Sequence, residues 1–210
     1  MIYKSLIVLL LCLCVELNAQ DRLINPEVYV GIDFGVTESK IMFNPSVNQS
    51  MLMGYNGGIV FRYIAEKNAG IQAELNYSQR GWVESNGLYS KQLNYIELPF
   101  MTHIFMGKTN RFFINIGPKI SYLLSEKVLL NQTTSATAIQ QTLAIQNRFD
   151  YGLCGGFGLL FGIGKSVFQL DTRVNYSLND VYSNKKTDYF SNSNNFNVSV
   201  NFAYFLKIKQ

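Results

Sequence analysis

The sequence predicts an all-β fold: an eight-stranded, antiparallel, up-and-down transmembrane β-barrel. Apolar and polar residues alternate in eight segments, short and long connections between these segments also alternate, and the chain is 14% aromatic but only 15% charged. Because successive side chains of a strand point to opposite faces, each segment has one apolar face and one polar or small face. The segments are residues 28–37, 58–65, 71–80, 95–104, 114–122, 150–161, 168–176 and 196–204.

The segment 71–80 shows the alternation most clearly. Leu75 and Tyr77 lie on one face, and Glu74 and Asn76 lie on the other. An amphipathic helix repeats every 3.6 residues and does not give this pattern. Small residues on the polar faces make room inside a narrow barrel, whose eight strands enclose little more than their own side chains. The glycines on these faces are Gly31, Gly35, Gly58, Gly117, Gly152, Gly156 and Gly158.

The connections indicate which kind of barrel this is. Outer-membrane barrels alternate tight periplasmic turns with longer external loops, whereas the Greek-key crossings of a sandwich give no such alternation. The long connections 125–148, with a short helix expected over 138–146, and 179–195 are the candidates for an external role. The expected short turns are 66–69, 107–110 and 162–165, and the expected long connections are 38–54, 81–90, 125–148 and 179–193.

Two prolines, Pro99 and Pro118, lie inside predicted strands. A proline has no backbone N–H, so each removes one hydrogen bond from the ladder between strands. We therefore expect a β-bulge at both positions.

The first segment of the chain predicts a signal peptide over residues 1–19, which leaves residues 20–210 as the barrel domain. Lys4 is followed by an apolar run over residues 6–15, which is too short for a transmembrane helix but typical of a signal-peptide core. Cleavage is expected after Ala19. A lipoprotein signal is disfavoured because Leu11, and not a small residue, precedes Cys12.

Composition excludes several classes of function. The formal charge is +4 and the basic residues are scattered, which does not fit nucleic-acid binding. Cys154 is the only cysteine beyond the signal peptide and His103 is the only histidine, so neither a disulfide framework nor a zinc site is expected. Gly155 and Gly156 belong to a strand pattern and do not precede a helix, so no phosphate-binding loop is expected. No cofactor, metal or catalytic residue is predicted.

Several stretches of the sequence together resemble the PorT-like outer-membrane β-barrel family of Bacteroidetes. The resemblance implies an outer-membrane location and, from some relatives, an accessory role in protein secretion. The expected partners are outer-membrane lipid and other outer-membrane or secretion components. It implies no catalytic residues. The stretches are Glu74-Leu75-Asn76-Tyr77-Ser78-Gln79-Arg80-Gly81, Tyr95-Ile96-Glu97-Leu98-Pro99-Phe100, Gly117-Pro118-Lys119, Phe149-Asp150-Tyr151-Gly152 with Gly156-Phe157-Gly158, and Arg173-Val174-Asn175-Tyr176-Ser177-Leu178-Asn179-Asp180.

Charged residues on the polar faces predict a structural row across the interior. Two pairs of opposite charge lie almost symmetrically about two of the short turns, so that two neighbouring carboxylates would each have a cation. Burying an isolated charge is costly, and a filled interior therefore demands such pairing. The row is Arg62, Glu74, Glu97 and Lys119, and Asp171 and Arg173 are the further interior charges of this structural set.

Two rival functions follow from other uses of these residues. A small outer-membrane lipid hydrolase would need a serine, an acid and His103 at one height in the barrel, yet no such cluster can be assembled. Glu74 and Glu97 could also form an acid–base pair, but this is disfavoured because a filled interior excludes substrate. A lipocalin-like soluble periplasmic barrel would need its aromatic residues inside. The orientation of Tyr77 relative to Glu74 discriminates between a soluble and a membrane barrel.

Overall fold

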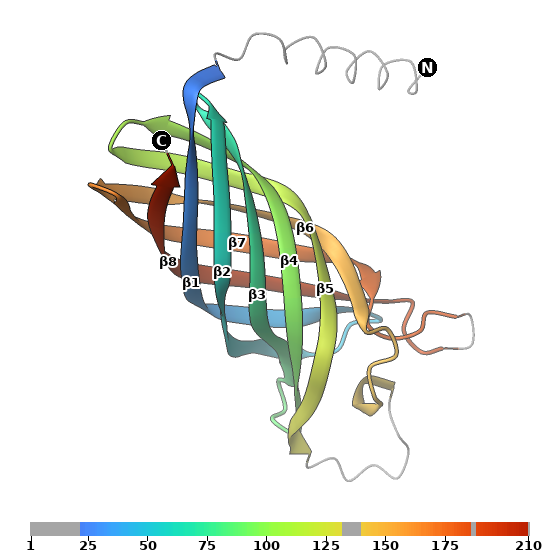
Figure 1. Ribbon diagram of the computed structural model, residues 1–210. Coiled ribbons are helices and arrows are strands. Elements are labelled where there is room, and N and C mark those ends of the chain that lie inside the picture. The colour runs from blue at the N-terminus through green and yellow to red at the C-terminus, as the bar shows by residue number, and fades with distance from the viewer. Residues whose placement is uncertain (1–21, 132–139, 186–187, 210) are drawn as a thin grey trace, which may run out of the picture.

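Eight antiparallel strands close into a barrel in the computed structural model, which describes residues 22–131, 140–185 and 188–209 (Figure 1). Every strand pairs with its neighbour in the sequence, and β1 pairs with β8 to close the ring. The predicted fold class is confirmed. The strands are β1 (Arg22–Asn44), β2 (Gln49–Glu66), β3 (Ala69–Glu84), β4 (Tyr89–Gly107), β5 (Asn110–Asn131), β6 (Phe149–Ile163), β7 (Ser166–Asp180) and β8 (Asn192–Lys209).

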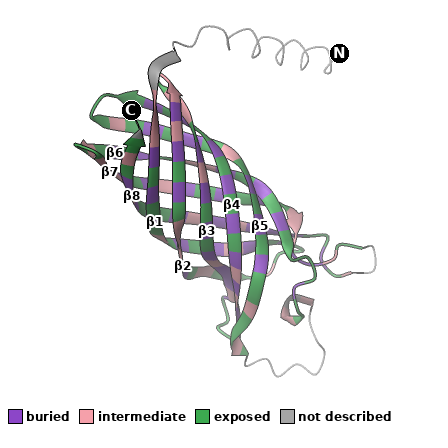
Figure 2. Cartoon of the chain, viewed as in Figure 1, coloured by how far each residue is buried: buried purple, intermediate pink, exposed green. Residues whose placement is uncertain are grey.

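The apolar faces of the strands point outward. Tyr77 is 45% exposed whereas Glu74 is 4% exposed, and buried and exposed residues alternate along the strands (Figure 2). Large apolar side chains facing out and polar side chains facing in are the reverse of a soluble barrel. A lipocalin-like soluble binder is therefore excluded.

The three short turns form as predicted. They join β2 to β3, β4 to β5 and β6 to β7, each through two residues, at the end of the barrel where the chain's C-terminus also lies (Figure 1). Gly107 and Gly164 have φ angles of 111° and 63°, which residues with a side chain rarely adopt. These glycines allow the tight reversals at this end.

At the opposite end the strands run further than the alternation predicted. Two of the four expected long connections shrink to residues 45–48 and 85–88 because the flanking strands continue. Gln92 and Asn94 are the outward residues of β4 here, so this strand loses its apolar–polar alternation while its pairing continues. Only residues 132–148 and 181–191 remain long connections.

The prolines do not form bulges, and that prediction is wrong. The register of β4 with β5 is the same at Leu98↔Ile120 and at Thr102↔Ile116, on either side of Pro99. Pro118 pairs with Leu153 in an uninterrupted register. A missing N–H removes one hydrogen bond but inserts no residue, so register can continue past it. The shifts in the β4–β5 pair lie at Ser90/Lys91 and Asn94/Tyr95.

The part of the chain that the structure describes contains one short helical element. The helix expected over 138–146 is represented by a 3-10 turn, η2 (Gln140–Thr142), and residues 138–139 lie outside the described part of the chain. The predicted signal peptide, residues 1–19, lies outside it as well. Among the residues that the structure describes, no helix is long and apolar enough to span a membrane.

Candidate functional site

The interior of the barrel is arranged in layers, and two of them are clusters of charged residues. In the first, which we call the Glu74 cluster, Arg173 donates from Nη1 to Glu74 Oε2 at 2.6 Å and from Nη2 to Oε1 at 3.0 Å. Gln72 and Asn76 donate to the same carboxylate, and Arg173 Nη2 also lies 3.5 Å from Asp171. A two-point guanidinium–carboxylate pair of this kind fixes geometry as well as charge.

The second, which we call the Arg80 cluster, lies one layer further from the short turns. Arg80 forms ion pairs with Glu97 and with Asp150, the latter at 2.9 Å, and its guanidinium stacks over the Tyr95 ring at 4.7 Å. Lys119 Nζ lies 3.9 Å from Glu97 Oε2. One guanidinium thus bridges carboxylates from two strands across the interior.

The predicted row differs from this arrangement. The four residues of the row and the two further charges, Asp171 and Arg173, all face the interior and are buried, and Lys119 does lie beside Glu97. The expected pairing of Arg62 with Glu74 is wrong, because the cation on Glu74 is Arg173 from β7, across the barrel. Arg62 instead donates to the side-chain oxygens of Gln72 and Gln169. Distance from a turn predicts neighbours on adjacent strands, but side chains this long also reach across a narrow lumen.

Little free space remains between the two charge clusters. A cavity of about 10 Å³ there is lined by residues that include Asn76, Glu97 and Arg173. That volume suits about one water molecule. The middle of the barrel is therefore filled, as expected for eight strands.

His103 and Cys154 are packed interior residues. His103 is fully buried, its Nδ1 lies 2.7 Å from Asn115 Oδ1, and its ring packs against Phe105 and Phe113. Cys154 is a free, buried thiol whose Sγ lies 3.4 Å from the carbonyl oxygen of Gly117. Among the described residues, neither a serine nor a carboxylate hydrogen-bonds to the imidazole, which a hydrolase triad would need.

An apolar cluster closes the interior at the end with the long connections. Trp82 and Phe43 meet edge to face, with ring centroids 5.6 Å apart, and Tyr182 packs on both. We call this group the long-loop cluster. Its members are Ile41, Phe43, Trp82, Tyr89, Leu93, Tyr95, Leu123, Ile145, Val181, Tyr182 and Phe190.

The two remaining long connections are bound to this cluster and to each other. Gln140 Oε1 accepts hydrogen bonds from the backbone N–H groups of Tyr189 and Phe190, at 3.0 Å each. Lys91 forms an ion pair with Glu126 at 3.0 Å and donates to a backbone carbonyl of the segment after η2. Hydrogen bonds from the Ser183 hydroxyl and the Lys185 N–H hold the pKa of Asp188 below its ordinary value. The described parts of the two long loops are thus hydrogen-bonded to each other and cover this end of the barrel.

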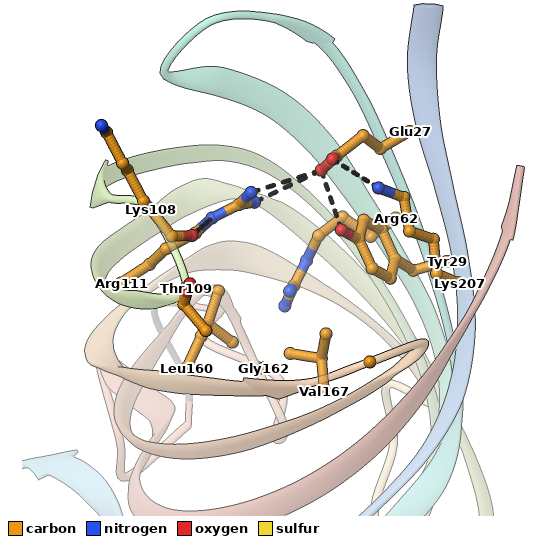
Figure 3. Close-up of a pocket in the computed structure, with 11 residues that line it drawn as sticks. Glu27, Tyr29, Arg62, Lys108, Thr109, Arg111, Leu160, Gly162, Val167 and Lys207 are labelled. Carbon is orange, nitrogen blue, oxygen red and sulfur yellow. Dashed lines mark hydrogen bonds and ion pairs between the residues drawn. The ribbon is translucent and has the colours of Figure 1, made fainter. Parts of the chain in front are cut away.

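The opposite end of the interior is open. A second apolar group, the short-turn cluster, surrounds Arg62 and includes Tyr29, Phe113, Leu160 and Phe205. Outside it lies a pocket of about 300 Å³, which we call the short-turn pocket (Figure 3). Its charged and phenolic lining residues are Glu27, Tyr29, Arg62, Lys108, Arg111 and Lys207.

Glu27 is the only carboxylate in the lining of the short-turn pocket. It accepts from Lys207 Nζ at 2.7 Å and from the Tyr29 hydroxyl at 2.8 Å, and it lies 3.4 Å from Arg111 Nη1 (Figure 3). Sequence reasoning missed this site. The available signal was the extension of the chain beyond its last aromatic residues, which places Lys207 on β8 beside Tyr29 on β1.

The sequence comparison decides the family. The model of the outer membrane protein β-barrel domain family matches residues 18–183, most of the chain. The chain belongs to this family. As a member of the outer membrane protein β-barrel domain family it resides in the bacterial outer membrane, with the short turns facing the periplasm and the long loops facing outward. No curated protein matches the sequence significantly.

Two solved structures with TM-scores of 0.50 show the same fold as this outer membrane protein β-barrel domain, and a third aligns with it at a lower score. Neisserial surface protein A (NspA) superposes with a TM-score of 0.50 at 13% identity, over 86% of this chain and 97% of that one. The outer membrane protein OprG from Pseudomonas aeruginosa gives 0.50 at 10% identity, over 90% and 98%. Ail, the attachment invasion locus protein of Yersinia pestis, gives 0.44 at 13% identity, over 86% and 99%.

The described part of this outer membrane protein β-barrel domain contains no candidate metal centre. Within residues 22–131, 140–185 and 188–209, no three His, Cys, Asp or Glu side chains are grouped so that they could hold a metal ion.

Proposed function

We propose that this protein is a non-conducting, non-enzymatic outer-membrane barrel with a structural or accessory role in protein secretion, related to the PorT-like barrels. One observation carries the proposal. Each stretch on which that resemblance rests contributes a residue to one of the two interior charge clusters. These residues are Glu74, Arg80, Glu97, Lys119, Asp150 and Arg173.

The position of these residues gives a physical reason for the stretches that resemble the PorT-like family. They specify how the interior is filled, because each carboxylate and cation needs its partner to compensate for lost hydration. A barrel selected for a filled interior serves as a rigid platform whose exposed ends contact lipid and partner proteins. The absence of a triad around His103 in the described structure also favours a non-catalytic role.

A secretion role is tested by deleting the gene in the organism of origin and comparing the proteins released into the medium. We expect the deletion strain to retain specific exported proteins in its periplasm, and a plasmid copy to restore their release. The matched control is a copy carrying Lys127→Ala, an exposed substitution outside the interior clusters, which should restore release fully. An unchanged set of released proteins would refute the secretion role.

Non-conduction is tested separately on the purified chain in planar lipid bilayers, with a large porin as the positive control. We expect no open-channel steps, because charged side chains fill the middle and the long-loop cluster closes one end. Reproducible steps with the unmodified protein would contradict a platform role whatever the secretion assay shows.

A further inference from the structure

The short-turn pocket has an excess of positive charge that its own residues do not neutralise. Four cations line it, and Glu27 is the single carboxylate. Lys207 and Arg111 are the residues that contact Glu27 as ion pairs. Lys108 and Arg62 form no ion pair with any residue in the described part of the chain. The pocket therefore presents a positive potential to the periplasm.

Arg62 forms the floor of the pocket, and its charge has only neutral partners. The residue is 1% exposed, and its Nε and Nη2 donate to Gln72 Oε1 at 2.9 Å and 2.6 Å. Nη2 also donates to Gln169, whereas Nη1 donates to none of the described residues. The guanidinium stacks 4.2 Å from the Phe205 ring. A charge buried among amides and aromatic rings lacks the counter-charge that the other interior arginines have.

The geometry around Arg62 suits an anion that enters from the periplasm. In Figure 3 the guanidinium lies between Arg111 on one side and Leu160 and Val167 on the other. One side of the short-turn pocket is therefore lined by cationic side chains and another side by apolar side chains. Its volume of about 300 Å³ is at the lower end of the range for small-molecule sites.

We infer that the short-turn pocket binds a small organic anion, with a carboxylate or phosphate group held by Arg62 and Arg111 and a short apolar body against Leu160 and Val167. Guanidinium groups bind both oxyanions through paired hydrogen bonds. Glu27 limits the affinity, because it engages Arg111 and Lys207. The site faces the periplasm only, since the long-loop cluster closes the other end of the interior.

The inference is tested on the full barrel in dodecyl maltoside, a neutral detergent that carries neither phosphate nor carboxylate. The side-chain N–H resonances of ¹⁵N-labelled arginine are followed while propionate or glycerol phosphate is added, with propionamide as the uncharged counterpart. We expect both anions to shift the Arg62 and Arg111 resonances saturably, and raised salt to weaken binding. Propionamide should leave these resonances in place.

Four variants sharpen the test. Arg62→Gln should weaken binding about tenfold or more. Lys108→Ala should weaken it about twofold or less, because the Lys108 ammonium points away from Arg62 and acts only at long range (Figure 3), while Lys127→Ala, exposed at the far end of β5, should leave it unchanged. Glu27→Gln should tighten binding about threefold, because it releases two cations from a competing carboxylate. A misfolded protein cannot bind the anion more tightly. The Glu27→Gln variant therefore still tests the inference if Arg62→Gln fails to fold. Equal shifts with propionamide, no response to either anion at millimolar concentration, or weaker binding by Glu27→Gln would overturn the inference.

Discussion

The two ends of the barrel differ in how they separate the charged interior from water. At both ends an apolar cluster separates the charged middle from water. The long-loop cluster is covered by parts of residues 140–148, 181–185 and 188–191, and Gln140 binds the first of these segments to the last. The short-turn cluster has no loop to cover it, because its connections contain two residues each, and a lone arginine passes through it to an open pocket. Connection length thus decides which end is closed and which end is available to a ligand.

The charges follow the same division. Arg80, next to the closed end, bridges two carboxylates, whereas Arg62, next to the open end, contacts only neutral groups. Arg80 is needed to compensate buried negative charge, whereas Arg62 is not. Stability and binding should therefore depend on different arginines.

The largest effect is expected when the bridging arginine is removed. Arg80→Met leaves Glu97 and Asp150 buried without their main cation, and we expect it to lower the free energy of unfolding by about 3–5 kcal/mol. Urea unfolding in lipid vesicles, followed by the fluorescence of Trp82, measures this. Arg62→Met is the matched control and should lower the free energy by about 1–2 kcal/mol, because it leaves two neutral amide oxygens without a donor but no charge without a partner. Equal losses would erase the difference between the two arginines.

A second prediction concerns the long-loop cluster itself. Trp82→Ala removes a fully buried ring that packs on Phe43 and Tyr182, and a loss of about 3–5 kcal/mol is expected. Circular dichroism during urea unfolding replaces fluorescence as the readout, because this is the only tryptophan. Trp82→Phe should retain most of the stability. If alanine were tolerated, the cluster would be a loose cover and not a packed end.

The boundary between hydrocarbon and water along one strand gives a third prediction. Leu98→Arg places a charge on the lipid-facing side of β4 and should cost about 2–4 kcal/mol. Gln92→Arg, also outward on β4 but near the long loops, should cost almost nothing. Folding yield into vesicles and urea unfolding both report the difference. Similar costs for the two variants would mean that the membrane lies closer to the long loops than the apolar faces indicate.

The smallest effect is expected at the open end. Lys207→Gln removes one of the ion pairs of Glu27, which is partly solvated, and should change the free energy of unfolding by about 1 kcal/mol or less. The same unfolding assay measures it at low and high salt. A loss as large as that of Arg80→Met would show that the short-turn pocket is part of the folding core.

The barrel was predictable from the sequence because lipid imposes one rule on every strand: outward residues are apolar and inward ones are not. That rule ends where the strands leave the hydrocarbon, so the outer extensions around Gln92 and Asn94 gave no signal. Pairing of Lys119 with Glu97 followed from distance to a turn, since the two residues lie on adjacent strands. The pairing of Glu74 with Arg173 could not be predicted in this way, because the two residues lie on strands that are not neighbours and meet across the lumen. The short-turn pocket joins residues from both ends of the sequence, Glu27 and Lys207, which only closure of the ring brings together.

The length of the strands has a consequence for what the cell surface presents. A bilayer is crossed by about 9–11 tilted residues of a strand, yet β5 contains 22 and β4 contains 19. At the long-loop end the surplus continues as a paired β-ribbon beyond the length needed to cross the hydrocarbon. Antibodies, phages or neighbouring proteins that approach the cell from outside would meet the flank of this ribbon, an ordered and hydrogen-bonded epitope, before they reach the hydrocarbon boundary.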